Sequence, residues 1–152
     1  MIMVSPRKIS QQVDRLQALA EFRHQLRMFL RFSEAAAQKL GLEPQHHQLL
    51  LQVAGAPSEV QATIGYVAQR LGLRHNTAVE LVNRCEEKGL VLRRHDGTDR
   101  RCVLLDVTPK GREMLEALSI DHAEELNDLA PRLIRTLSRL KAPRSETKAS
   151  IK

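Results

Sequence analysis

Apolar residues recur at steps of three and four along the first part of the chain, which is the spacing of one face of an α-helix. They are Val13, Leu16, Ala20, Leu26, Phe29 and Leu30. This pattern predicts a long helix over 9–40 with Ser10 as its N-cap. A second long apolar stripe follows Thr108 and predicts a helix over 109–140 with Thr108 as its N-cap. Pro131 is expected to break or kink this helix.

Shorter elements are predicted between the two long helices. Pro44 begins a helix that ends before Gly55, and Thr63 caps another that ends at Gly72. After a tight turn, a third short helix is predicted over about 75–88. Its apolar face consists of Ala78, Leu81, Val82 and Cys85.

The periodicity changes from helical to extended after Gly89. Two extended apolar runs lie on either side of Asp96-Gly97, a typical turn pair, and predict a β-hairpin over about 90–107. The polar segment 58–62 is compatible with a loop or with a short strand. The predicted fold class is therefore mainly α with one small hairpin.

Composition and charge narrow the range of partners that this chain could bind. The chain has 152 residues, 24 Lys and Arg against 18 Asp and Glu, and a formal net charge of +6, which favours a polyanion such as nucleic acid. No apolar run approaches the roughly 20 residues of a membrane helix and no signal-peptide segment is present, so we expect a cytoplasmic protein without a membrane partner. Four arginines gather at the predicted hairpin, where an external anion would relieve their repulsion: Arg93, Arg94, Arg100 and Arg101.

The order helix, tight turn, helix, hairpin is that of a winged helix-turn-helix, whose second short helix enters the major groove of DNA. The stretch from Leu71 to Gly111 resembles the MarR family of bacterial transcriptional regulators. The shared elements are Leu-Gly-Leu at 71–73, Lys-Gly-Leu-Val at 88–91, Asp-x-Arg at 99–101 and Thr-Pro-x-Gly at 108–111. The flanking long helices match the family in order and length, but in no diagnostic residue.

The resemblance implies a homodimer with interwoven terminal helices that binds a pseudo-palindromic operator in double-stranded DNA, and we expect a repressor. The apolar stripes of the long helices exceed what a small winged-helix core needs, which agrees with association. We expect one domain over 1–141. Its parts are dimerisation helices at 9–40 and 109–140 and a winged helix-turn-helix at 44–107, with the recognition helix at about 75–88 and the wing at about 90–107. A basic tail over 142–152 is expected to be disordered.

The predicted DNA contacts form two groups. The recognition helix contributes Arg74, His75, Asn76, Thr77, Glu80, Asn83 and Arg84. The wing contributes Arg93, Arg94, Thr98, Asp99, Arg100 and Arg101. Helix capping is the alternative role for Asn76 and Thr77. The helix entry departs from the family's common Ser-x-Ser-Thr-Val-Ser-Arg, so the resemblance carries over no operator sequence.

Within the wing, the resemblance gives Asp99 the role of holding the loop and Arg101 that of supporting the wing or reaching DNA. Arg100 and Thr98 lie at the tip and suit phosphate or the minor groove. The family also implies a small phenolic or otherwise anionic effector that lowers DNA affinity, at a site that the sequence leaves unassigned. No cofactor is expected.

Other functions on the same fold are a cysteine-based redox response and a metal response. Cys85 lies on the apolar face of its helix and is expected to be a buried, inert thiol, whereas Cys102 is less constrained. Neither lies in the N-terminal helix, where the family's peroxide-sensing thiol is found. Adjacent His46 and His47 point in different directions, unlike zinc-binding pairs four residues apart, and catalytic motifs are missing, so neither a metal site nor an enzyme is expected. The basic wing argues against a winged helix that binds only protein.

Overall fold

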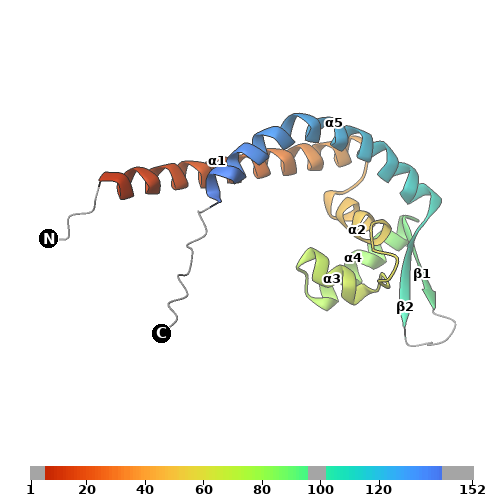
Figure 1. Ribbon diagram of the computed structural model, residues 1–152. Helices are drawn as coiled ribbons and strands as arrows, with labels where there is room; N and C mark the ends of the chain where they lie inside the picture. Colours follow the sequence, from red (N-terminus) through yellow and green to blue (C-terminus); the bar gives the residue numbers. More distant parts are fainter. Residues whose placement is uncertain (1–5, 96–101, 142–152) are drawn as a thin grey trace, which may run out of the picture. The chain divides into compact units, whose positions relative to one another are not determined.

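The computed structural model describes residues 6–95 and 102–141 (Figure 1). Its helices are α1 (Pro6–Lys39), α2 (Pro44–Ala54), α3 (Ile64–Leu71), α4 (His75–Glu87) and α5 (Pro109–Leu140). Its strands are β1 (Val91–His95) and β2 (Val103–Val107). The predicted fold class, mainly α with one small hairpin, is confirmed.

The chain divides into two compact units. Unit 1 contains residues 6–31 and 124–141 of the described chain, and unit 2 is Phe32–Ala123. Both long helices pass from one unit into the other. The expectation that 1–141 is a single domain stays a prediction, and the predicted tail over 142–152 lies outside the described residues.

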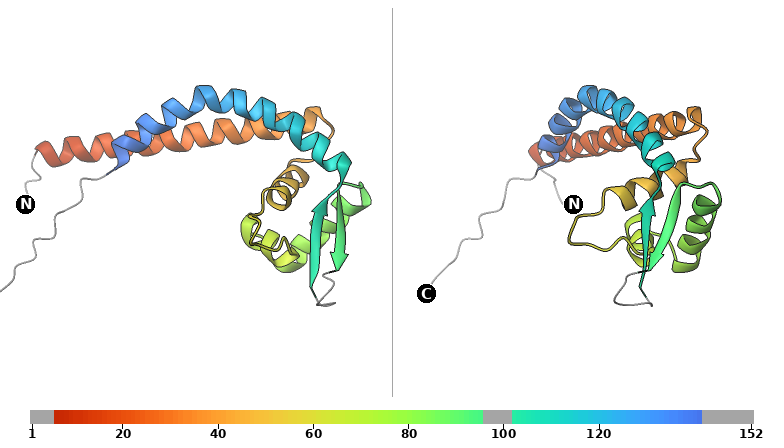
Figure 2. Two further views of the ribbon diagram at one scale, coloured as in Figure 1. Left: turned by 45° about the vertical axis from the view of Figure 1, so that its right-hand side comes forward. Right: turned by 90° about the vertical axis from the view of Figure 1, so that its right-hand side faces the viewer.

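Unit 2 has an aliphatic core that all of its elements help to form. In Figure 2 the short helices α2, α3 and α4 gather beside the hairpin. The core contains Ala36, Ala37, Leu42, Leu49, Leu50, Val53, Val67, Leu81, Val82, Cys85, Leu90, Val91, Leu105, Val107 and Leu118. The apolar face predicted for α4 is buried, as the three- and four-residue spacing requires.

The hairpin is antiparallel, with Val91 opposite Val107 and His95 opposite Val103. Segment 58–62 is a loop that pairs with the sheet at its C-terminal end. There Thr63 forms an isolated bridge with Leu104, and the Leu105 amide donates to the Ala62 carbonyl at 2.8 Å. This pairing fastens the start of α3 to β2.

Several predicted boundaries change. The first helix starts at Pro6, so Ser10 lies inside it and is not its N-cap, because proline suits the first helical turn. The predicted recognition helix, α4, ends at Glu87, one residue before the prediction, and Lys88 is its C-cap. The last helix continues through Pro131 as one element, so Pro131 does not break it, and a kink at Pro131 stays a prediction.

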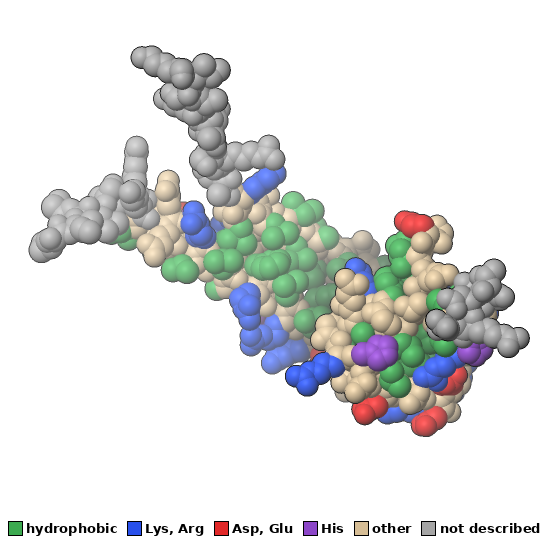
Figure 3. All heavy atoms as spheres, turned by 90° about the horizontal axis from the view of Figure 1, so that it is seen from below, with side chains coloured by type: hydrophobic (Ala, Val, Ile, Leu, Met, Phe, Trp, Pro, Cys, Tyr) green, Lys and Arg blue, Asp and Glu red, His purple; other side chains and the backbone are tan. Residues whose placement is uncertain are grey.

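Unit 1 is a pair of helical segments with little core of its own. Its fully buried residues include Ala18 and Leu129, and many large apolar side chains are exposed. The exposed ones are Ile9, Val13, Leu16, Leu19, Leu26, Met28, Leu30, Leu126, Ile134 and Leu137. Figure 3 shows hydrophobic side chains gathered on the surface of this part of the molecule. Within the described ranges, no helix combines the length and apolarity needed to cross a membrane.

Candidate nucleic-acid interface

The helix-turn-helix begins with a well-capped α3. The Thr63 hydroxyl oxygen accepts from the Tyr66 amide at 3.1 Å, which confirms the predicted N-cap. At the other end Gly72 adopts the left-handed conformation (φ 64°), and the Leu73 amide donates to the Ala68 carbonyl at 2.8 Å. A left-handed residue reverses the chain at low cost only when it is glycine, so Gly72 sets the tight turn before α4.

The first turn of α4 is open to solvent. Its N-cap is Arg74, whose side chain makes no capping hydrogen bond, and no acidic residue lies in this turn. His75, Asn76 and Thr77 are exposed. The capping alternative for Asn76 and Thr77 is therefore wrong, because both lie inside the helix. Unpaired amides and the positive end of the helix dipole make this turn suitable for an anion such as a DNA phosphate.

Farther along α4, the wing is tied to the helix. Arg93 of β1 forms an ion pair with Glu86 and also donates to the Asn83 side-chain oxygen at 2.6 Å. Asn83 and Arg93 were both predicted to contact DNA, but in this structure they bond to each other. Glu80 and Arg84 are exposed on the same helix.

The second arginine of the wing is held within the hairpin. The Arg94 Nε donates to Asp106 of β2 at 2.7 Å. Arg94 pairs with Leu104 in the register, so Asp106 is its diagonal neighbour on the same face of the sheet. Sequence reasoning missed both carboxylates, Glu86 and Asp106. The alternation along the hairpin could have indicated Asp106 once the register was assumed.

The remaining predicted wing contacts, Thr98, Asp99, Arg100 and Arg101, lie outside the described residues. So does the predicted turn Asp96-Gly97. Their roles in the wing stay predictions.

A tight junction connects α4, the hairpin and α5. The Thr108 hydroxyl donates to the Gly89 carbonyl at 2.7 Å, and its oxygen accepts from the Gly111 amide at 3.1 Å, which confirms Thr108 as a helix cap. A Cβ atom on Gly111 would lie 2.5 Å from the Leu90 carbonyl oxygen and 2.7 Å from a Val107 methyl. The glycine of the Thr-Pro-x-Gly element is therefore needed because the backbones approach closely there.

The cysteines differ in their surroundings. Cys85 is fully buried, and burial raises the pKa of its thiol to about 12, which makes it a poor nucleophile. This agrees with the predicted inert thiol. Cys102 is partly exposed and its sulfur lies 3.5 Å from the Gln61 side-chain oxygen.

The adjacent histidines face different neighbours, as predicted. His46 is 0 % exposed, and its Nε2 lies 3.6 Å from a Glu43 oxygen. The His47 ring packs 5.2 Å from the ring of His122. Burial lowers the pKa of both His46 and His47, so both rings are neutral near pH 7. Among the described residues, no group of three or more His, Cys, Asp or Glu is arranged to hold a metal ion.

Comparison with known proteins supports the predicted family resemblance. The sequence model of the MarR family matches residues 40–101, which include α2, α3, α4 and β1. The predicted resemblance to the MarR family is therefore confirmed over this segment. MarR-family proteins are DNA-binding transcriptional regulators rather than enzymes, so the comparison supports both of those predictions.

One relative of this chain is a protein of Thauera aromatica named for transcriptional regulation of the hcr operon. The two are 29% identical over 138 residues, which are 86% of this chain and 81% of the relative.

Solved MarR-family structures share the fold. A MarR family transcription regulator aligns with a TM-score of 0.70 at 19% identity, covering 86% of this chain and 91% of its own. A Staphylococcus aureus MepR variant bound to an oligodeoxyribonucleotide aligns with a TM-score of 0.60 at 20% identity, covering 79% and 95%. CouR of Rhodococcus jostii, bound to p-coumaroyl-CoA, gives 0.58 at 24% identity, covering 73% and 82%.

Proposed function

We propose that this chain is a cytoplasmic repressor of the MarR family that binds a pseudo-palindromic operator as a homodimer. The observation that carries the proposal is the first turn of α4, which is exposed, lacks acidic residues and has no side-chain cap. A helix end of this kind accepts phosphate and brings the neighbouring side chains to the base edges of the major groove.

Within that turn, His75, Asn76 and Thr77 are the proposed base-reading residues, and Arg74 the proposed phosphate contact. Asn83 and Arg93 bond to each other, so we assign them the role of placing the wing against α4. Glu80 and Arg84 stay predicted contacts on the exposed side of the helix. In the wing, Arg94 stays predicted, as do Thr98, Asp99, Arg100 and Arg101.

The homodimer is supported by the exposed apolar side chains of unit 1. Ile134 is 64 % exposed and Leu16 58 %, values that are unfavourable for large aliphatic side chains on the surface of a monomer. A second copy of the same helices would cover this surface, and a twofold axis would then present two α4 helices to two half-sites.

An effector is the remaining part of the proposal. CouR has p-coumaroyl-CoA bound, and we propose that a small aromatic acid or its CoA thioester likewise lowers the DNA affinity of this chain. Coupling between two sites is typically worth about 1–3 kcal/mol, which corresponds to a change in affinity of roughly 5- to 150-fold.

The test begins with selection of bound fragments from the source genome by the full chain at two salt concentrations. The expected result is a pseudo-palindrome with half-sites about one helical turn apart, bound by a species with the mass of a dimer. Fragments without a shared sequence, or a monomer bound to DNA, would contradict the proposal.

Variants then locate the contacts on the selected operator. Arg74→Gln removes one phosphate contact from each protomer, so it should lower the log–log salt slope of binding by about 1.8 (about 0.9 per contact). The double variant Asn76→Ala/Thr77→Ala should instead reduce discrimination between operator and unrelated DNA. The control is Arg112→Gln, which removes the same charge from the exposed face of α5. An Arg74→Gln slope equal to that of the control would remove Arg74 from the interface. Addition of p-coumaroyl-CoA tests the effector separately, since unchanged binding would exclude only this ligand.

A further inference from the structure

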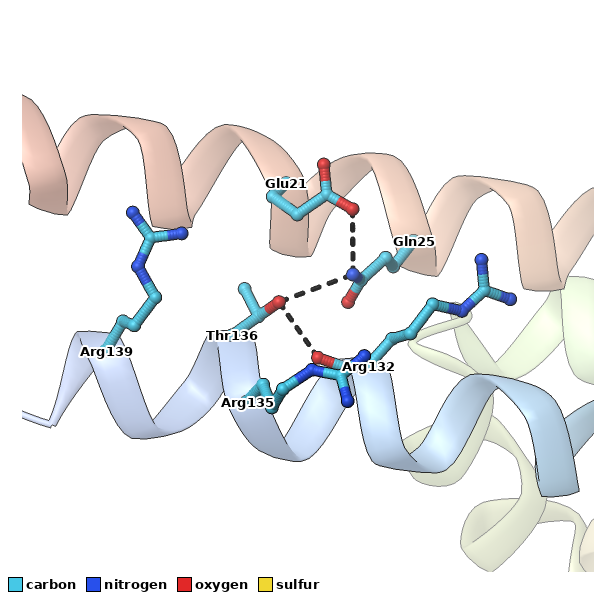
Figure 4. Close-up of a pocket in the computed structure, with 6 residues that line it drawn as sticks. All are labelled: Glu21, Gln25, Arg132, Arg135, Thr136 and Arg139. Carbon is cyan, nitrogen blue, oxygen red and sulfur yellow. Dashed lines mark hydrogen bonds between the residues drawn. The ribbon is translucent and has the colours of Figure 1, made fainter.

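Unit 1 contains a cleft between α1 and α5 that the proposed DNA binding does not use. Its volume is about 320 Å³. The lining residues are Glu21 and Gln25 of α1 and Arg132, Arg135, Thr136 and Arg139 of α5. Figure 4 shows Arg132 and Arg139 extending from α5 toward α1 on either side of Thr136. All six residues belong to unit 1, so the cleft is formed within one compact unit.

The lining has excess positive charge. The three arginines are spaced by three and four residues, so they share one face of α5 and repel one another. Among the residues that the structure describes, Arg139 has one distant ion-pair partner, Asp14 at 4.0 Å. Arg132 donates to a backbone carbonyl of its own helix at 3.3 Å, and in the described part of the chain neither Arg132 nor Arg135 forms an ion pair. An anion in the cleft would relieve this repulsion.

The single carboxylate of the lining is already engaged. Glu21 accepts a hydrogen bond from the Gln25 amide nitrogen at 2.8 Å (Figure 4). Three guanidinium groups against one carboxylate leave the lining with a surplus of two positive charges. A ligand with two or more negative charges therefore matches the lining better than a monoanion.

The floor of the cleft is polar, and one acceptor on it has no partner. Gln25 and Thr136 are each only 5 % exposed. The Gln25 amide nitrogen donates to the Thr136 hydroxyl at 3.3 Å, and that hydroxyl donates to the Arg132 carbonyl at 3.0 Å. The Gln25 side-chain oxygen is buried and accepts no hydrogen bond from any described group. A buried acceptor without a donor is costly, so a ligand that brings a hydroxyl group would gain by supplying one.

We propose that this cleft binds a small organic polyanion that also carries a hydroxyl group, such as a hydroxycarboxylate or a sugar phosphate. The arginines of α5 bind the negative charges, and the Gln25 side-chain oxygen accepts the hydroxyl hydrogen after a small movement of its side chain. The site is separate from the DNA-facing turn of α4 and does not depend on the proposed repressor function.

Citrate is the probe for the negative charges, measured by calorimetric titration of the full chain. The expected result is saturable binding that the double variant Arg132→Gln/Arg135→Gln weakens by about tenfold or more. Arg112→Gln, which removes an exposed charge elsewhere on α5, should keep wild-type affinity. The proposal would be overturned if the wild type showed no saturable citrate binding, or if Arg112→Gln lost as much affinity as the double variant.

Tricarballylate, which is citrate without its hydroxyl group, tests the role of Gln25. We expect it to bind several-fold more weakly than citrate to the wild type, and the two ligands to bind alike to Gln25→Met. Equal affinities for the wild type would remove the hydroxyl from the proposal. Inorganic pyrophosphate, tested in parallel, shows whether phosphate or carboxylate is preferred.

The other occupant that this surface could accept is a second copy of the chain. Light scattering on the same samples separates the two cases. If the arginine double variant has lost its dimer mass, the arginines serve association and the proposal is overturned. If the variant keeps the wild-type mass and loses citrate, the cleft is a ligand site.

Discussion

The two units of this chain use helices in opposite ways. Unit 2 covers its apolar residues with its own elements, so that Leu49, Leu50 and Val67 are fully buried. Unit 1, built from parts of the two longest helices, leaves large aliphatic side chains such as Ile134 exposed. The length of a helix therefore does not by itself ensure that its apolar side chains are buried. The short helices of unit 2 have neighbours on several sides, whereas a pair of helices can cover only one face of each partner.

The largest expected effect comes from the core of unit 2. Leu81 is 1 % exposed, and Leu81→Ala should lower the free energy of unfolding by about 2–5 kcal/mol because it leaves a cavity. Leu126→Ala, at an exposed position of unit 1, should lower it by less than about 1 kcal/mol in a monomer. Urea unfolding monitored by circular dichroism measures both, and equal losses would contradict the contrast between the units.

The second-largest expected loss of stability comes from a substitution at the junction of α4, the hairpin and α5. Gly111→Ala forces a Cβ against the Leu90 carbonyl and Val107, and should lower the free energy of unfolding by about 1–3 kcal/mol. Gly65→Ala is the matched control, because its Cβ would meet only the Thr63 hydroxyl oxygen at 3.8 Å. Within α3 this change should be neutral or stabilising by up to about 1 kcal/mol. A harmless Gly111→Ala would show that the backbones can separate at this point.

Polar substitutions on unit 1 test whether a second copy covers its apolar surface. Leu16→Asp/Ile134→Asp should raise the dissociation constant of the proposed dimer at least tenfold, about 1.4 kcal/mol, while unit 2 stays folded. Sedimentation at several concentrations measures it. Lys39→Asp, which changes an exposed residue at the end of α1, is the control. An unchanged dimer would mean that these apolar residues lie outside the interface.

The ion pairs of the wing should contribute less to stability than the core and the junction do. Arg93 and Glu86 are both partly exposed, so Arg93→Ala should cost only about 0.2–1 kcal/mol of stability. A double-mutant cycle with Glu86→Ala isolates the coupling between the two side chains. High salt should reduce that coupling. A coupling that is absent at low salt would mean that the pair does not fasten the wing to α4.

The smallest expected effect is the change in the free energy of unfolding with pH. Burial lowers the pKa of His46 and His47 below the ordinary value of 6.5, so below that pH the unfolded chain takes up protons that the folded chain does not. The free energy of unfolding should therefore be constant above about pH 6.5 and should fall as the pH drops toward about 5.5. The Lys88 side chain holds the pKa of Glu43 below its ordinary 4.5, so this carboxylate titrates at lower pH.

Urea unfolding at several pH values tests the histidines. His46→Leu should flatten the slope, whereas His75→Asn, at an exposed position, should leave it unchanged. A wild-type stability that is independent of pH across this range would contradict the assignment of buried, neutral rings.

Local patterns in the sequence were enough to predict most of the secondary-structure elements of unit 2. The spacing of Ala78, Leu81, Val82 and Cys85 predicted the buried face of α4, and Thr63, Gly72 and Thr108 were correctly placed at helix ends. These features depend on neighbours within a few residues, and a pattern of spacing and residue type encodes them directly. Proline was harder to interpret, since Pro6 starts a helix and Pro131 does not end one.

The partners of the charged groups could not be predicted in the same way. The sequence by itself determined that arginines gather at the wing, that the chain is basic, and that a helix-turn-helix precedes a hairpin. Only the tertiary structure decided that Arg93 bonds to Asn83 and Glu86, that Arg94 bonds to Asp106, and that Gln25 meets Thr136, 111 positions along the chain. An ion pair or a buried hydrogen bond requires an approach to within about 3 Å, and folding brings such groups together from positions that no local pattern relates.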